Sequence, residues 1–167
     1  MATKGRYAAD TTVSYRQSIA EIETLIERFN GGAPLEFIRG RVADRDIIEF
    51  AIQGRRIRLW IALPDRESFR YTPARKFERY EDEITKEWNK EINRLWRSMT
   101  AVVKAKLIAI EDGISTLEAE FLANLVLPAG TTVGEAMATT LEETLRTGVM
   151  PPMVPSGWAP IALGSGN

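Results

Sequence analysis

The chain has 167 residues, of which 44% are hydrophobic and 27% are charged, and its formal net charge at pH 7 is −1. This composition is typical of a globular protein, and we expect residues 1–167 to form a single domain. The chain has no cysteine and no histidine. This composition excludes disulfides, thiol catalysis and mechanisms that need an imidazole base. The chain has no apolar run of membrane-spanning length and no signal-peptide pattern, so we expect no membrane contact and a cytoplasmic location.

Charge is unevenly distributed along the chain. Between residues 35 and 79, eleven lysines and arginines accompany seven acidic residues, a balance of +4. From residue 113 onward, Arg146 is the one cation beside five glutamates, a balance of −4. A basic centre permits local binding of an anion although the whole chain is nearly neutral.

The first third of the chain predicts one amphipathic helix. Ser14 and Gln17 have the spacing of a capping box, and apolar residues follow at three- and four-residue steps as far as Phe29. Asn30 and two glycines then end the helix. Before it, residues 11–13 suggest a short edge strand.

The central element is a β-hairpin over residues 46–63. Gly54 suits the first central position of a type II′ turn, so that Gln53 would pair with Arg56. Counting outward, the cross-strand pairs are Ile52 with Ile57, Phe50 with Leu59, and Ile48 with Ile61. One face of this hairpin is wholly apolar, and the other carries its arginines and Trp60.

The segment before the hairpin, residues 35–41, predicts a third strand with two possible orientations. If Ile38 and Val42 point inward, Arg39 and Arg41 join the outer face of the hairpin. The opposite orientation places Leu35 and Phe37 in the core.

The second half of the chain predicts helices. Residues 77–112 have the apolar seam of one long helix of about 50 Å, which is long for a domain of this size, so we expect a homo-oligomer through this helix. Capping patterns at Ser115 and Thr132 begin two shorter helices, and the proline-rich residues 149–167 predict an extended tail. The fold class is therefore α+β: a helix and small antiparallel sheet over residues 11–64, and a helical part over 77–147.

The outer sheet face is the candidate ligand-binding site, and its residues are Arg39, Arg41, Arg56, Arg58 and Trp60. Guanidinium groups bind phosphate, and an indole ring beside them can stack on a base. The competing interpretation is a solvated sheet face, whose arginines protect an edge and whose Trp60 lies under the tail. There is no P-loop, dinucleotide fingerprint, nucleophile elbow or metal-ligand pattern, so we expect neither an enzyme nor a cofactor nor a metal.

The segment WNKEINRLWRSMTAVVKAKLIAIEDGISTLEAEFLANLVLPAGTTVGE, which is residues 88–135, and the later LRTGVMPPMVP resemble small uncharacterised proteins of tailed phages and prophages. This resemblance implies an accessory protein in a bacterial cytoplasm that acts on DNA or against a host defence. The expected function is non-enzymatic binding of a phosphate-bearing ligand, with single-stranded nucleic acid favoured. The alternative is an anti-defence protein that sequesters a nucleotide signal or blocks a host protein.

Overall fold

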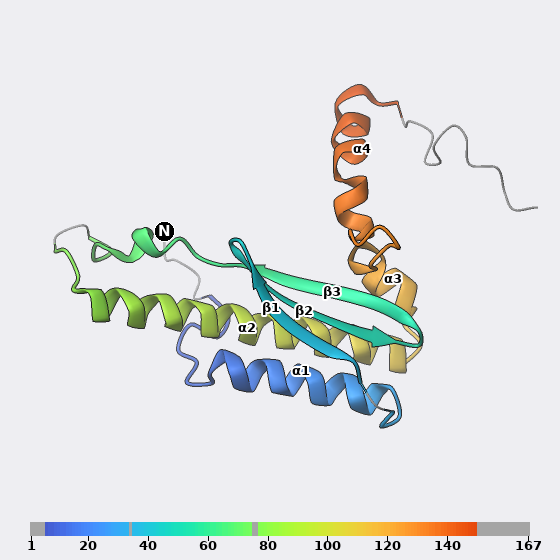
Figure 1. Ribbon diagram of the computed structural model, residues 1–167, viewed down its shortest axis with the longest axis horizontal. Helices are drawn as coiled ribbons and strands as arrows, with labels where there is room; N and C mark the ends of the chain where they lie inside the picture. The colour runs from blue at the N-terminus through green and yellow to red at the C-terminus, as the bar shows by residue number, and fades with distance from the viewer. Residues whose placement is uncertain (1–5, 34, 75–76, 150–167) are drawn as a thin grey trace, which may run out of the picture.

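The computed structural model describes residues 6–33, 35–74 and 77–149. Its elements are, in order, α1 (Tyr15–Phe29), β1 (Phe37–Val42), β2 (Arg45–Ile52), β3 (Arg55–Ala62), η1 (Arg66–Phe69), α2 (Glu81–Glu111), α3 (Leu117–Phe121), η2 (Leu122–Asn124) and α4 (Val133–Thr147). The expected α+β fold is confirmed (Figure 1). No helix within these ranges is long and apolar enough to cross a membrane. The predicted tail lies almost wholly outside the described residues.

Helix α1 begins and ends where the sequence predicts. The Ser14 hydroxyl accepts from the N–H of Gln17, whose side chain accepts in turn from the N–H of Ser14, and Asn30 caps the other end. The expected strand at residues 11–13 is wrong. There the Val13 N–H donates to the Thr11 hydroxyl at 3.2 Å, a local bond that competes with strand pairing.

The hairpin has the predicted faces but not the predicted register. Its turn residues are Gln53 and Gly54, with φ of 50° and 75°, the signature of a type I′ turn. The observed pairs are Ile52 with Arg55, Phe50 with Ile57, and Ile48 with Leu59, so the expected register is wrong by two residues. An even shift keeps every side chain on its own face, because the side-chain period of a strand is two.

Strand β1 adopts the second of its two possible orientations. Phe37 lies opposite Phe50, and the two rings stack with centroids 6.2 Å apart. Ile38 and Val42 point away from the core and are 61% and 62% exposed. The gain of an aromatic partner for Phe37 explains this choice.

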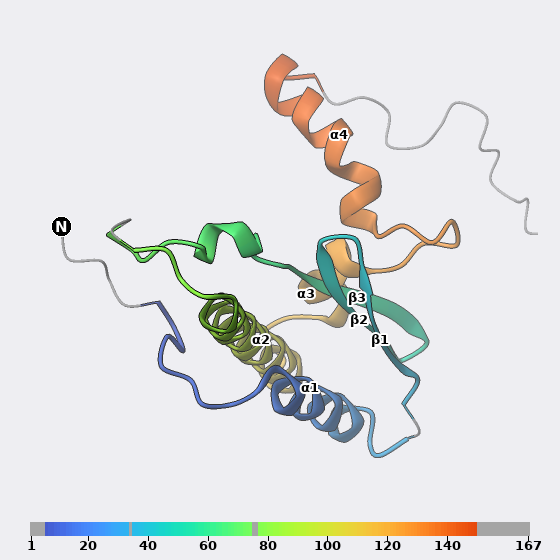
Figure 2. The same ribbon diagram turned by 60° about the vertical axis from the view of Figure 1, so that its left-hand side comes forward.

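Helices α1 and α2 cover one face of the sheet, which we call the covered face (Figure 2). The fully buried side chains between them and the sheet include Ile22, Phe50 and Trp96. Where the two helices meet, the Thr100 hydroxyl donates to the Ser18 carbonyl at 3.2 Å. The buried positions of α2 thus pack within the chain, and an oligomer through residues 77–112 stays a prediction.

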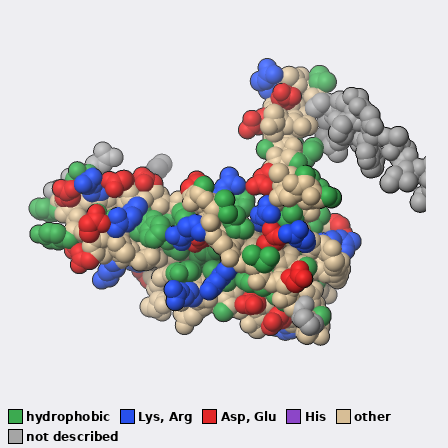
Figure 3. All heavy atoms as spheres, viewed as in Figure 1, with side chains coloured by type: hydrophobic (Ala, Val, Ile, Leu, Met, Phe, Trp, Pro, Cys, Tyr) green, Lys and Arg blue, Asp and Glu red, His purple; other side chains and the backbone are tan. Residues whose placement is uncertain are grey.

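The C-terminal elements leave the far end of α2 and return to the sheet. Thr116, not the expected Ser115, caps α3 by accepting from the N–H of Ala119 at 3.2 Å. The N–H of Val126 then donates to the Arg56 carbonyl at 2.8 Å, which covers part of the β3 edge. Helix α4 starts at the predicted capping box of Thr132 and projects from the body as a narrow arm (Figures 1 and 3).

Candidate functional site: arginines on opposite faces of the sheet

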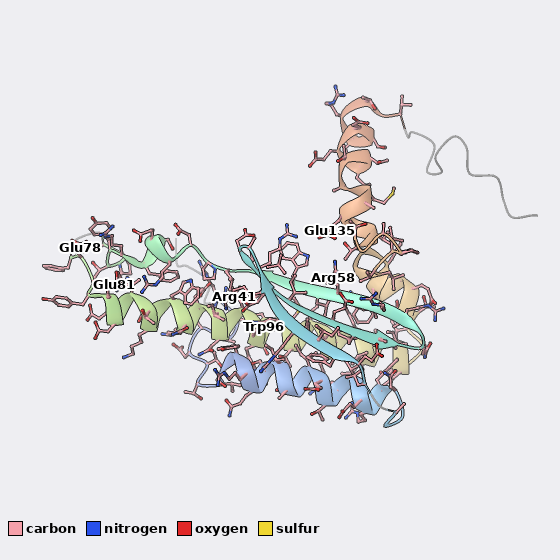
Figure 4. All side chains as sticks on the ribbon, viewed as in Figure 1. Arg41, Arg58, Glu78, Glu81, Trp96 and Glu135 are labelled. Atoms are coloured by element: carbon pink, nitrogen blue, oxygen red, sulfur yellow. The ribbon has the colours of Figure 1, made fainter. Side chains whose placement is uncertain are left out.

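The five predicted site residues do not share one surface, so the expectation of a single Arg/Trp face is wrong. Arg39 and Arg41 lie on the covered face, at the β1 edge. Arg56, Arg58 and Trp60 lie on the opposite face, which we call the open face. Figure 4 labels one arginine of each group, with Arg41 near Trp96 and Arg58 near the base of α4.

A groove of about 500 Å³ runs between the start of α1 and β1, and we call it the edge groove. Side chains that matter for its chemistry are Tyr15 and Arg16 from α1, Arg39 and Arg41 from β1, and Asp46 from β2. Trp96 of α2 and Ile19 of α1 also line it. The edge groove thus combines three guanidinium groups with one carboxylate and two aromatic side chains.

Arg41 is fixed in the edge groove by an ion pair. Its Nε and Nη2 donate to the two carboxylate oxygens of Asp46, at 2.7 and 3.2 Å. Asp46 is buried and also accepts from the Trp96 indole N–H at 3.4 Å. The guanidinium group of Arg41 lies 5.7 Å from the centre of the Trp88 ring. Arg41 is therefore positioned before any ligand arrives, although it shares its charge with Asp46.

Arg16 and Arg39 differ from Arg41, because neither pairs with a carboxylate among the described residues. Both are exposed, and the Nε of Arg16 lies 3.3 Å from the hydroxyl of its neighbour Tyr15. The first turn of α1 also has no acidic residue, so the positive end of the helix dipole is not offset there. The lining of the edge groove therefore has three positive side chains and one negative side chain.

Sequence reasoning missed Arg16. It lies 23 positions before Arg39, and only the packing of α1 beside β1 brings the two together. One signal was present: an arginine in the first turn of a helix without an acidic residue is unfavourable for the helix dipole.

Two arginines of the open face, Arg56 and Arg58, share one buried carboxylate. Glu49 is only 8% exposed and accepts from Arg56 and from the Nε of Arg58, the latter at 2.8 Å. Burial by itself raises the pKa of Glu49, but the hydrogen bonds from the two arginines lower it below its ordinary value. Glu49 is therefore ionised at neutral pH, and Arg56 and Arg58 have less charge to offer a phosphate group.

Trp60 is likewise engaged within the chain. The guanidinium group of Arg45 lies 4.0 Å from the centre of the Trp60 ring, and its Nη1 lies 3.4 Å from a carboxylate oxygen of Glu135 in α4. One face of the indole is thus occupied by a cation. A second groove of about 390 Å³, the open-face groove, has an apolar part that includes Ile38, Val42 and Trp60. The charged side chains of Arg45, Glu49, Arg58 and Glu135 line the rest of it.

The described residues contain no cluster of three or more acidic side chains that could hold a metal ion. Comparison with protein-family models, with curated proteins and with solved structures finds no match for this chain.

Proposed function

We propose that this is a non-enzymatic binding protein that takes a phosphate-bearing ligand, single-stranded nucleic acid, in the edge groove. The observation that carries the proposal is the excess of arginine in that groove. Arg16, Arg39 and Arg41 converge there with Asp46 as the one carboxylate of the lining. The ligand class is the one expected from the sequence. Of the five candidate residues the proposed site keeps Arg39 and Arg41, and it adds Arg16.

The three arginines have complementary roles in this proposal. Arg16 and Arg39 have no carboxylate partner among the described residues, so their donors are available to phosphate oxygens. Arg41 is oriented by Asp46 and adds a positioned positive charge. Tyr15 is half-buried at the groove, and its ring, which has the guanidinium group of Arg16 5.8 Å from its centre, is an aromatic surface beside the phosphate sites. A charged track beside an aromatic ring suits a strand whose bases are unpaired.

The open face supports this ligand less well. Its arginines Arg56 and Arg58 share the carboxylate of Glu49, and Trp60 lies against Arg45. A phosphate group there would have to displace ion pairs that are already formed, one of them to a buried acid.

The test is fluorescence anisotropy of a labelled oligothymidine at low and at physiological salt. Wild-type protein should bind, with an affinity that falls steeply as salt increases. Arg39→Glu should weaken binding by about tenfold or more, because it removes one phosphate contact and adds a repulsive charge. Arg28→Glu is the matched control, since Arg28 is exposed at the other end of α1 and the net charge changes equally.

Two results would contradict the proposal. Wild-type protein that does not bind the oligonucleotide even at low salt would remove nucleic acid as the ligand. A loss of binding in Arg56→Ala, with Arg39→Glu unaffected, would move the site to the open face.

One observation favours a second candidate, sequestration of a single nucleotide as an anti-defence activity. The edge groove of about 500 Å³ falls in the range of about 300–1,000 Å³ for small-molecule sites. Isothermal titration calorimetry with mononucleotides and cyclic dinucleotides separates the two ligands. A nucleotide-sequestering protein should bind one small ligand tightly and stoichiometrically, whereas a strand-binding protein should bind longer oligonucleotides more tightly than short ones.

A further inference from the structure

Helix α4 carries an apolar stripe that nothing covers within the described residues. None of the 15 residues of α4 is buried. Leu141 and Leu145 are 50% and 84% exposed, and Met137 continues the stripe one turn earlier. Helices of this length are only marginally stable alone in water, and an amphipathic face ordinarily lies against an apolar surface. We therefore expect this stripe to lie against an apolar partner surface.

The base of α4 is fixed, which keeps the stripe away from the sheet of its own chain. Thr132 caps the first turn, and the N–H of Val133 donates to the Leu125 carbonyl at 2.9 Å. A Cβ on Gly134 would lie 2.9 Å from the carbonyl oxygen of Ala123, so the close approach requires glycine. Figures 1 and 2 show α4 projecting from this base on the side of the sheet opposite α1.

The open face is a second uncovered apolar surface, and it matches α4 in length. Ile38 and Val42 stand on it beside Trp60, which is 37% exposed, and no atom lies within 4 Å of the Cβ position above Gly40. Strands β2 and β3 have eight residues each, which is about 26 Å of strand. Helix α4 has 15 residues, or about 22 Å. Gly40 lines the open-face groove, where the helix would lie.

A small charge complementarity accompanies the apolar match. The open face has three arginines, Arg45, Arg56 and Arg58, against two carboxylates, Glu49 and Glu135, so an excess of one positive charge remains. Glu142 of α4 lies three positions before Leu145 and therefore flanks the apolar stripe, where it can approach this excess charge, whereas Glu143 lies on the opposite side of the helix.

From these observations we infer that the protein forms a homodimer in which α4 of each copy lies along the open face of the other. A two-fold axis makes both contacts at once, because each copy contributes the same helix and the same sheet face. The occupant of the open-face groove is thus a second copy of this chain. The edge groove opens on the other side of the sheet, so the dimer leaves it accessible, and the inference does not depend on the proposed ligand.

The first test is sedimentation equilibrium of the full chain over a range of concentrations. Wild-type protein should dimerise, and Leu145→Glu should raise the dimer dissociation constant by about tenfold or more, since it places a charge in an apolar contact. Thr139→Glu adds the same charge to the opposite side of α4, where the residue is exposed, and should have little effect. Wild-type protein that stays monomeric, or a dimer that tolerates both Leu145→Glu and Val42→Glu, would overturn the inference.

The second test uses the absence of native cysteine, which makes an engineered disulfide unambiguous. Chains carrying Val42→Cys and chains carrying Leu141→Cys are mixed, oxidised and run on a non-reducing gel. A covalent dimer that forms in the mixture, and in neither variant alone, supports helix-on-sheet exchange. Cross-linking of Leu141→Cys alone would instead indicate contact between two α4 helices, and cross-linking of Val42→Cys alone would indicate pairing of two β1 edges. Either of these results overturns the proposed arrangement.

Discussion

The covered and open faces of the sheet carry similar residues with different consequences. Each face has one buried carboxylate bound to arginine: Asp46 binds Arg41 on the covered face, and Glu49 binds Arg56 and Arg58 on the open face. At the edge of the covered face Arg16 and Arg39 remain beyond this pairing, whereas the open face has Glu135 beside its third arginine. The difference shows that the positions of the carboxylates, more than the number of arginines, decide which guanidinium groups have no carboxylate partner among the described residues.

The two faces also differ in what they do with apolar side chains. On the covered face Ile48, Phe50 and Ile57 are fully or almost fully buried under α1 and α2. On the open face Ile38 and Val42 remain in contact with solvent. The first face stabilises the monomer, and the second has apolar surface available for another molecule.

The largest expected effect on the free energy of unfolding comes from truncating an apolar side chain of the covered face, and a truncation on the open face is the comparison. Phe50→Ala should lower the free energy of unfolding by about 3–5 kcal/mol, because it opens a cavity in a packed core. Ile38→Ala on the open face should change it by about 0.5 kcal/mol or less. Urea unfolding at low protein concentration measures both values. Equal losses would show that the open face is packed as tightly as the covered face.

Removal of the buried carboxylate of the open face should have the next largest effect. Glu49→Ala leaves Arg56 and Arg58 close together without their shared partner, and it should cost about 1–3 kcal/mol of unfolding free energy. Glu118→Ala is the control, because Glu118 and its partner Arg55 are both largely exposed and such pairs contribute about 0–1 kcal/mol. If the two variants are equally stable in urea unfolding, the Glu49 pairing is not a structural interaction.

The arginines themselves should differ in their structural roles. Arg58 donates to Glu49 and to the Gly130 carbonyl, the latter at 2.8 Å, so Arg58→Ala should cost about 1 kcal/mol. Arg39→Ala should be neutral within about 0.5 kcal/mol, because Arg39 is exposed and has no carboxylate partner among the described residues. Thermal unfolding of the two variants separates a structural arginine from one that is available to a ligand. A destabilised Arg39→Ala would argue against the availability of that side chain.

The smallest expected effect is a difference in acid stability. The pKa of Glu49 is lower in the folded protein than the ordinary value of 4.5, so its contribution to stability is fully present above that value. This contribution is lost as the pH falls through the lowered pKa of the folded state, because the unfolded chain binds the proton first. Unfolding free energies measured between about pH 6 and pH 3 should therefore fall less in Glu49→Gln than in wild type. Parallel curves for the two proteins would contradict the assigned direction.

The sequence predicted most of the fold, because the relevant signals are local. Capping boxes at Ser14 and Thr132 located the starts of two helices, and alternation along the hairpin assigned its two faces correctly. The register was wrong by two residues because the type I′ turn requires Gln53 to adopt a positive φ, which is uncommon for a residue other than glycine. A shift of this size leaves the alternating pattern unchanged, so the pattern alone had no means of detecting it.

The candidate site was less predictable than the fold, because it depends on contacts between distant residues. Alternation along residues 37–42 shows that the arginines and the exposed aliphatic residues point to opposite sides, and the helix periodicity shows that α4 is amphipathic. Only the tertiary structure decided that Phe37 stacks on Phe50, that Arg16 joins Arg39, and that the stripe of α4 is left uncovered. The physical reason is that periodicity reports which side of an element is apolar, whereas the partner of that side, and the carboxylate that neutralises a given arginine, are determined by packing across the whole chain.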